Sequence, residues 1–153
     1  MKILSIQSGH PLWEKTIEFA SDCSWKAGPA LAERMKENAF TDRERVIVAI
    51  EDDRIVGFCT LSEKDELPDR YDFTPFIGFV FVDERFRGRR LSGMMIDHAM
   101  KLAAEAGFDK INIMSGEIGL YEKYGFSKLG DYETIYGTTD QLFVKTVNDE
   151  RLK

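Results

Sequence analysis

The most informative segment of this sequence is Val82-Asp83-Glu84-Arg85-Phe86-Arg87-Gly88-Arg89-Arg90-Leu91-Ser92-Gly93. It joins a predicted buried strand, residues 76–82, directly to a predicted long helix, residues 91–106, whose apolar residues recur at helical spacing. The segment holds four of the ten arginines of the chain. Arginines beside a helix N-terminus are unfavourable, because the free backbone N–H groups already make that end positive. The cluster therefore indicates that an anion such as a phosphate binds there.

A solvated basic loop that pairs with Asp83 and Glu84 is the simpler alternative for this segment. The spacing of a Walker P-loop and the Gly-x-Gly-x-x-Gly fingerprint of dinucleotide-binding folds are both absent. The position between a strand and a helix favours the anion site. Gly88 lets the backbone approach an anion closely, and Gly93 keeps the first turn of the helix open.

The composition limits the partners that the chain can have. Its 153 residues carry a formal net charge of -6, with 27 acidic and 21 basic side chains. This acidity argues against nucleic acid and against a membrane surface as a partner. No apolar run approaches the roughly 20 residues of a membrane span, and residues 1–6 do not resemble a signal peptide. We expect one cytoplasmic domain that covers residues 1–153.

The hydrophobic pattern predicts the order β-α-α-β-β-β-α-β-α-β-β, an α/β fold with a mixed sheet. Gly78, inside the strand 76–82, predicts a bulge or a close backbone approach. A helix opening at Pro11 and another over about 29–38, with Leu31, Met35 and Ala39 as its apolar stripe, are expected before the strands. The predicted strands are 1–6, 45–50, 55–61, 76–82, 110–114, 127–136 and 141–146. After the helix 91–106, a short helix is predicted that Ser115 caps and Gly125 ends.

Other kinds of catalytic site find little support in the sequence. Cys23 and Cys59 are far apart and are expected to be reduced and structural. His10 and His98 cannot form a metal site between them, so we expect no metal. The Gly-x-Ser-x-Gly elbow of a serine hydrolase does not occur.

Two motifs resemble those of a known family, the GCN5-related N-acetyltransferases, or GNAT superfamily. Phe86-Arg87-Gly88-Arg89-Arg90-Leu91-Ser92 is similar to its pyrophosphate-binding loop, Arg/Gln-x-x-Gly-x-Gly/Ala. Arg87 matches this pattern, whereas Arg90 and Ser92 replace its two small residues. Leu120-Tyr121-Glu122-Lys123-Tyr124-Gly125-Phe126 resembles the family's Leu-Tyr-x-x-x-Gly-Phe segment. The Asn that commonly precedes this last helix is missing, and Met114 or Ser115 stands there.

The resemblance implies a GNAT-like, mostly antiparallel central sheet with about four flanking helices, and acetyl-CoA as the cosubstrate. Tyr121 would be the general acid that protonates the departing thiolate, and the competing Tyr124 is expected to pack. The pantetheine arm would pair with the backbone of Val80, Phe81 and Val82. The pyrophosphate would be held by Arg87, Gly88, Arg89, Arg90, Leu91, Ser92 and Gly93.

The general base stays open at this point. Many relatives use a Glu on or near the fourth strand, but residues 76–82 contain no carboxylate. The remaining candidates, besides a water molecule, are Asp65, Glu66, Asp72 and Glu117.

The acceptor implied by the resemblance is an amine of a small molecule or a peptide, and the acidic composition favours a cationic one. An aromatic cluster offers a wall for its pocket and comprises Trp25, Tyr71, Phe73 and Phe76. The alternative function is that of a non-catalytic acyl-CoA-binding or regulatory module on the same fold. Many family members form homodimers, and no residue here decides the oligomeric state.

Overall fold

The computed structural model describes residues 1–147, which form a seven-stranded sheet flanked by helices. The helices are α1 (Trp13–Asp22), α2 (Gly28–Lys36), α3 (Leu91–Glu105) and α4 (Leu120–Lys123). The strands are β1 (Lys2–Ile6), β2 (Arg45–Glu51), β3 (Arg54–Ser62), β4 (Phe76–Val82), β5 (Lys110–Ser115), β6 (Ser127–Glu133) and β7 (Thr139–Thr146). This order confirms the predicted mixed α/β fold.

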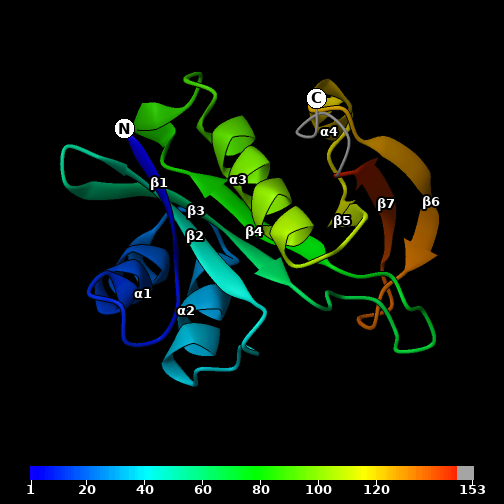
Figure 1. Cartoon of the computed structure of the whole chain (residues 1–153), viewed down its shortest axis with the longest axis horizontal. Coiled ribbons are helices and arrows are strands. Elements are labelled where there is room, and N and C mark those ends of the chain that lie inside the picture. The colour runs from blue at the N-terminus through cyan, green and yellow to red at the C-terminus, as the bar shows by residue number, and fades with distance from the viewer. Residues whose placement is uncertain (148–153) are drawn as a thin grey trace.

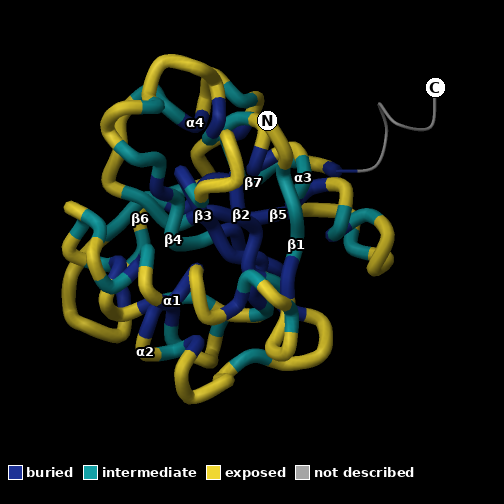
Figure 2. Tube along the Cα trace, turned by 90° about the vertical axis from the view of Figure 1, so that its left-hand side faces the viewer, coloured by how far each residue is buried: buried dark blue, intermediate teal, exposed yellow. Residues whose placement is uncertain are grey.

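The sheet has the strand order β1-β2-β3-β4-β5-β7-β6, and only β4 and β5 are parallel neighbours. In Figure 1, α1 and α2 lie on one face of the sheet and α3 lies on the other. The core accordingly has a main cluster on each face, with Trp13 and Leu31 on one and Met95 and Ala99 on the other, and a small third cluster of Leu67, Phe76 and Leu142. Figure 2 shows the buried residues concentrated in the central strands.

The middle of the sheet opens between β4 and β5. These strands pair at only two positions, Phe76 with Asn112 and Ile77 with Ile113. The Asn112 side chain donates a hydrogen bond of 3.0 Å to the Pro75 carbonyl at this closed end. Beyond Ile77 the paired positions end, so within residues 1–147 no strand pairs with β4 from Gly78 onward on that side.

A distortion of β4 lies at the point where the two strands part. The register against β3 shifts between Phe58 and Thr60, and Phe79 adopts a left-handed φ of 50°. The sequence predicted a bulge or a close approach at Gly78, and the structure shows a close approach there by the Thr60 side chain, whose Oγ1 atom is 3.2 Å from the position of an added Cβ. In this conformation the Phe79 ring packs edge-on against Trp25, with 6.2 Å between the ring centroids.

Two further expectations need correction. Ser115 does not cap the last helix, because α4 begins only at Leu120, after Gly119 in a left-handed conformation. The Ser115 hydroxyl instead accepts a hydrogen bond of 3.0 Å from the Glu117 N–H in the preceding turn. Ala39 lies beyond the end of α2 and is exposed, and Ala32 takes its place in the buried stripe.

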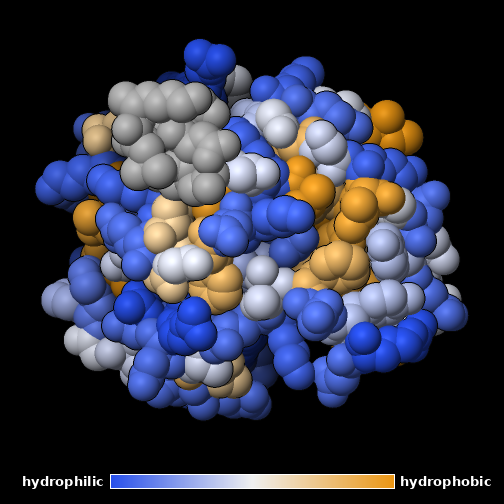
Figure 3. All heavy atoms as spheres, turned by 45° about the vertical axis from the view of Figure 1, so that its right-hand side comes forward, coloured by the Kyte–Doolittle hydropathy of each residue, from blue (hydrophilic) through white to orange (hydrophobic). Residues whose placement is uncertain are grey.

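The surface is mixed in character. Figure 3 shows a face on which hydrophobic side chains gather in separate patches among hydrophilic ones. Within residues 1–147, no helix combines the length and the apolar character needed to cross a membrane. The same residues contain no group of three or more His, Cys, Asp or Glu side chains that could hold a metal ion, and Cys23 and Cys59 are free thiols.

Candidate active site

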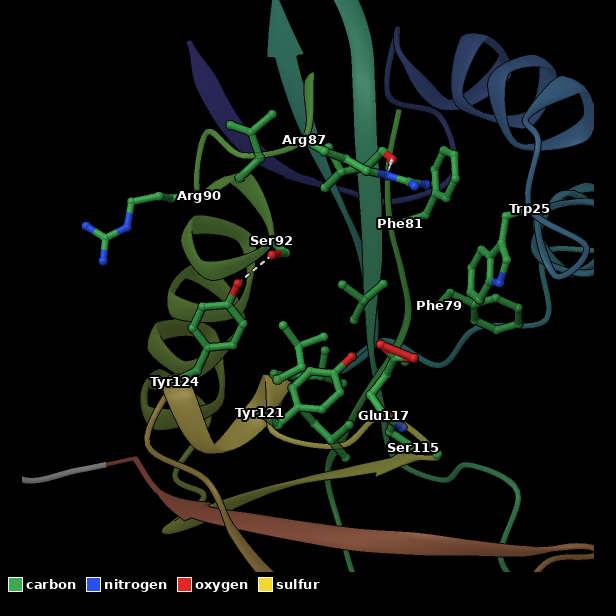
Figure 4. A pocket seen from close by; sticks show the side chains of 18 of the residues that line it. Trp25, Phe79, Phe81, Arg87, Arg90, Ser92, Ser115, Glu117, Tyr121 and Tyr124 are labelled. Atoms are coloured by element: carbon green, nitrogen blue, oxygen red, sulfur yellow. Dashed lines mark hydrogen bonds between the residues drawn. The ribbon is translucent and has the colours of Figure 1, made fainter. Parts of the chain in front are cut away.

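A cavity of about 780 Å³ fills the opening between β4 and β5 and reaches the start of α3 and the side of α4. Figure 4 shows side chains from all of these elements around it. Arg89 and Gly93 are the two predicted site residues that do not line it. The predicted site residues that do line it are Val80, Phe81, Val82, Arg87, Gly88, Arg90, Leu91, Ser92 and Tyr121.

One wall of the cavity is the unpaired edge of β4. Val80 and Val82 are partly exposed there, while Phe81 is buried on the α1–α2 face of the sheet. The Val82 carbonyl accepts a hydrogen bond of 2.9 Å from the Arg87 Nε atom. Since a strand edge offers backbone donors and acceptors in a row, this wall can pair with an extended ligand as an added strand would.

The opposite end of the cavity is the N-terminus of α3. Arg90 is its N-cap residue with φ 63° and ψ 22°, and no side chain among residues 1–147 caps the helix. The first α-helical hydrogen bond runs from Met94 N–H to the Arg90 carbonyl, which leaves the N–H groups of 91–93 available to an anion. The Arg90 side chain points away from the cavity (Figure 4), so only its backbone faces the site.

The four clustered arginines have different surroundings. Arg85 pairs with Asp83 at 3.2 Å, and Arg89 pairs with Glu51 at 3.6 Å. The Arg85 hydrogen bond lowers the pKa of the Asp83 carboxyl below its usual value. The simpler alternative therefore describes Arg85 correctly, since it is neutralised by Asp83. Arg87 lies over the Phe81 ring at 5.7 Å and reaches the cavity.

Tyr121 projects from the short helix α4, and its hydroxyl points into the cavity (Figure 4). Its side chain is only 6% exposed and packs against the rings of Phe126 and Phe143, at 6.2 Å and 5.8 Å between centroids. Burial is the main cause that raises the pKa of Tyr121 to about 12, and the charge of Glu117 adds to it. The phenol is therefore protonated at neutral pH and can donate that proton.

Tyr124, the competing candidate, is held away from this position. Its hydroxyl makes a hydrogen bond of 2.7 Å with the Ser92 hydroxyl in the first turn of α3. Its ring lies against Gly93, where an added Cβ would come within 2.9 Å of the ring atom Cε1. Gly93 thus makes room for the Tyr124 ring, while its backbone N–H is among those left free at the start of α3.

The four carboxylates considered as a base fall in different places. Asp72 is exposed and does not line the cavity, whereas Glu117 lines it beside Tyr121. Asp65 lies against β4, with its Oδ2 atom 3.3 Å from the position that a Cβ on Gly78 would take. Glu66 shares a hydrogen bond with Asp140.

The aromatic residues proposed as one pocket wall are separated in the structure. Trp25 stacks on Phe81 beside the cavity, with centroids 5.9 Å apart and planes within 3°. Tyr71 and Phe73 instead pack edge-on against Tyr132 of β6, at 5.2 Å and 5.6 Å. Only Trp25 of the four lines the cavity, so the predicted wall is reduced to this residue.

Thr60 and Asp140 were not predicted as site residues, although both lie beside residues that line the cavity. The hydroxyl of Thr60 faces Gly78, and the Asp140 carboxylate faces Gly116, a lining residue of the cavity. A threonine inside an apolar strand and an aspartate beside a hairpin turn are common local patterns. Nothing in their sequence neighbourhood marks them, because their importance arises from contacts with distant segments.

Comparisons with known proteins point in one direction. The model of the acetyltransferase (GNAT) family matches residues 12–126. An aminoglycoside 6'-acetyltransferase type Ii has a similar structure, with a TM-score of 0.75 and 19% identity over 96% of this chain and 97% of that one. An aminoglycoside 6'-N-acetyltransferase complexed with coenzyme A has a TM-score of 0.71 and 17% identity, over 96% and 97%.

A third similar structure is a GNAT family acetyltransferase from Elizabethkingia anophelis with acetyl-CoA bound. Its TM-score is 0.64 at 16% identity, over 95% of this chain and 97% of that chain. No curated protein matches the chain by sequence. At these identities, the structural likenesses show a shared fold.

Proposed function

The chain belongs to the acetyltransferase (GNAT) family, and on that premise we propose that it transfers the acetyl group of acetyl-CoA to an amine. One observation carries the proposal: a single cavity joins an unpaired strand edge, a helix N-terminus with free N–H groups and the hydroxyl of Tyr121. These are the three features that an acyl-CoA substrate, with its pantetheine arm, its pyrophosphate and its thioester, requires of a protein. We further propose that residues 1–153 act as one domain.

The residues present fit acetyl-CoA at each end of the cavity. The N–H groups at the start of α3, helped by Gly88 with its φ of 82°, would hold the pyrophosphate together with Arg87. The β4 edge at Val80 and Val82 would bind the pantetheine arm through backbone hydrogen bonds. Bound there, acetyl-CoA supplies an activated acetyl thioester.

Tyr121 is proposed as the general acid. A phenol whose pKa is raised to about 12 keeps its proton at neutral pH, and its hydroxyl opens into the cavity. In direct transfer, the amine nitrogen forms the new C–N bond as the C–S bond breaks. Tyr121 would donate its proton to the departing sulfur, which avoids the release of a free thiolate.

We propose that the acceptor is a cationic amine. Two of the similar structures are aminoglycoside acetyltransferases, and aminoglycosides carry several amino groups. The net charge of -6 and the carboxylates of Asp65 and Glu117 beside the cavity support the same direction. A primary ammonium group has a pKa of about 10.4, so it must lose a proton before it attacks. A carboxylate at this end of the cavity suits that task.

The test is a measurement of CoA thiol release from acetyl-CoA with a panel of monoamines, diamines and aminoglycosides. Thiol release that depends on the amine is the expected result. Thermal stabilisation by acetyl-CoA without thiol release across the whole panel would instead favour the non-catalytic acyl-CoA-binding module.

A further inference from the structure

Three carboxylates lie around two glycines that line the cavity, although none of the three is itself a lining residue. The Asp65 Oδ2 atom is 3.3 Å from the position of an added Cβ on Gly78, and the Asp140 Oδ1 atom is 3.6 Å from that on Gly116. Both glycines line the cavity, one on β4 and the other just after β5. Glu66 joins the group through its hydrogen bond with Asp140. The carboxylates therefore flank both sides of the opening, where side chains on the two glycines would have stood.

No cation among residues 1–147 forms an ion pair with any of these three carboxylates. Arg34 on α2 exerts the only favourable charge effect on Asp65, and its guanidinium already pairs with Glu44 at 3.5 Å. Burial is the main cause that raises the pKa of Asp65 to about 6. Burial, followed by the Asp140 hydrogen bond, raises that of Glu66 to about 8. Within residues 1–147 these carboxyl groups thus lack a cation partner, and their raised pKa values mean that a bound cation would bring them to the charged form.

An independent feature at the same place is the hydroxyl of Thr60. Its side chain is buried, with the residue 1% exposed, and Oγ1 has no hydrogen-bond partner within residues 1–147. This atom lies 3.2 Å from the added Cβ position on Gly78, the same point that Asp65 faces. An unpartnered buried hydroxyl is costly, so it indicates that a polar group of a ligand or a water bound to it belongs there.

We propose that Asp65, Glu66 and Asp140 form the acceptor site for an amine with at least two ammonium groups. Asp65, with Thr60 beside it, holds the ammonium group nearer β4, and the Glu66–Asp140 pair holds a second one. This inference rests on the proposed acetyl transfer and specifies its acceptor. Linear polyamines and amino sugars both carry two or more ammonium groups and therefore both fit this site.

The arrangement of the chain supports two separate positions for the two charges. Asp65 and Glu66 are adjacent in sequence, but Asp65 turns to β4 whereas Glu66 turns to β7 and Asp140. The Glu66 carbonyl also accepts a hydrogen bond of 2.8 Å from the Ile135 N–H, which fixes this segment to the β6–β7 hairpin. A molecule with a single ammonium group can neutralise only one of these two positions.

The test compares butane-1,4-diamine with n-butylamine, which has the same carbon chain and one ammonium group. We expect kcat/KM to favour the diamine by about tenfold or more, the effect of one charge-assisted contact. Glu66→Gln and Asp140→Asn should each bring the diamine-to-butylamine ratio of kcat/KM close to one, because each variant loses a carboxylate that holds the second ammonium group. Asp69→Asn, an exposed carboxylate that pairs with Lys64, is the control and should keep the preference. Equal preference in the wild type and in both site variants would overturn the proposal.

Binding measured without turnover separates this proposal from the proposed function. Calorimetric titration of butane-1,4-diamine into the protein with CoA present should show binding that Glu66→Gln weakens. Diamine binding without acetylation would contradict acetyl transfer and leave the site standing. Acetylation of n-butylamine as efficiently as of the diamine would support acetyl transfer and contradict the site.

Two further readouts sharpen the result. Because the pKa of Glu66 is raised to about 8, binding of a cation beside this carboxyl should release protons near pH 7, measured by titrations in buffers of different ionisation enthalpy. That release should disappear in Glu66→Gln, and an unchanged release would exclude Glu66 from the site. Spermidine and 2-deoxystreptamine, used as further acceptors, distinguish a linear polyamine from an amino sugar.

Discussion

Tyr121 and Tyr124 show how neighbouring residues of one motif acquire different roles. Tyr121 lies in α4 and Tyr124 directly follows it; both line the cavity, and their ring centroids are 6.4 Å apart. Tyr124 is tied to Ser92 by a hydrogen bond, whereas the Tyr121 hydroxyl faces open space in the cavity. The resemblance led us to expect Tyr121 as the acid and Tyr124 as a packing residue, but the sequence could not identify Ser92 as the partner of Tyr124.

Tyr121→Phe should lower kcat by about 100-fold or more, because it removes the proton donor and retains the packing of the ring. The dissociation constant of acetyl-CoA should stay within about twofold, since the loss concerns only the transition state. Steady-state kinetics together with calorimetric binding of acetyl-CoA measure both values. Tyr124→Phe is the matched control and should retain most of kcat, so an equal loss in both variants would remove Tyr121 from the acid role.

Arg90 occupies a position at which the family motif has glycine, and its backbone explains the motif. A left-handed conformation with φ 63° costs a residue with a side chain about 1–2 kcal/mol, and glycine adopts it freely. The arginine keeps the required backbone at that cost, while its side chain points away from the cavity (Figure 4).

Arg90→Gly should therefore raise the free energy of unfolding by about 0.5–1 kcal/mol, measured by urea denaturation. Arg89→Gly, one residue earlier, is the control and should lower it, because that variant loses the ion pair with Glu51 and gains no relief. A lower stability for Arg90→Gly than for the wild type would show that the Arg90 side chain contributes more than its backbone costs.

At the scale of elements, the junction between α3 and α4 defines one side of the cavity. Gly93 on α3 and Tyr124 after α4 are in contact, and the hydrogen bond of 2.7 Å between Ser92 and Tyr124 lies beside them. The sequence predicted both helices but could not predict this contact. The reason for a glycine at position 93 comes from a ring 31 positions later in the chain, whereas its predicted part in holding the pyrophosphate concerns its backbone N–H.

Gly93→Ala should destabilise the protein by about 1–3 kcal/mol, because the new Cβ would lie 2.9 Å from the Tyr124 ring and force it to move. This cost outweighs the gain of up to about 1 kcal/mol that alanine brings within a helix. Thermal unfolding with and without acetyl-CoA measures it. Ser92→Ala removes only the hydrogen bond and should cost about 0.5–1.5 kcal/mol. Unchanged stability of Gly93→Ala would mean that the ring moves freely and does not fix the two helices.

Strand β4 shows which features a local sequence pattern can predict and which it cannot. Its bounds, Phe76–Val82, were predicted to the residue, because a continuous apolar run identifies a buried strand. The sequence predicted a bulge or a close approach at Gly78; the close approach is at Gly78, and the left-handed conformation is at Phe79. The contacts of Phe79 with Trp25 and of Gly78 with Thr60 decide between the two residues, and both partners are remote in sequence.

At the scale of the whole molecule, sequence determined the order of elements and the two motifs but not the acceptor end of the cavity. Asp65, Glu66 and Asp140 come from two segments about 75 residues apart and meet because β7 inserts between β5 and β6. Asp65 and Glu66 were among four equivalent candidates in the sequence. Only the tertiary arrangement separates them from the exposed Asp72.

The same carboxylates make global stability depend on pH. The pKa of Asp65 is raised to about 6 and that of Glu66 to about 8, chiefly by burial, so the folded chain holds these protons more tightly than the unfolded chain does. Their contribution to the free energy of unfolding is complete below about pH 4 and is lost as the pH rises to about 8.

Glu66→Gln should therefore flatten the decrease in the free energy of unfolding between pH 6 and about 8, measured by urea denaturation at several pH values. Glu133→Gln, an exposed position on β6, is the control and should decline as the wild type does. Parallel curves for the wild type and Glu66→Gln would contradict the protonation of Glu66 in the folded state.

The central claim is that the cavity between β4 and β5 transfers acetyl from acetyl-CoA to an amine. The most direct measurement is the initial rate of CoA thiol release from acetyl-CoA, with and without butane-1,4-diamine, for the wild type and Tyr121→Phe. The predicted result is a rate that requires the diamine, falls by about 100-fold in Tyr121→Phe, and accompanies formation of the monoacetylated diamine. Thiol release that ignores both the amine and Tyr121 would contradict the claim.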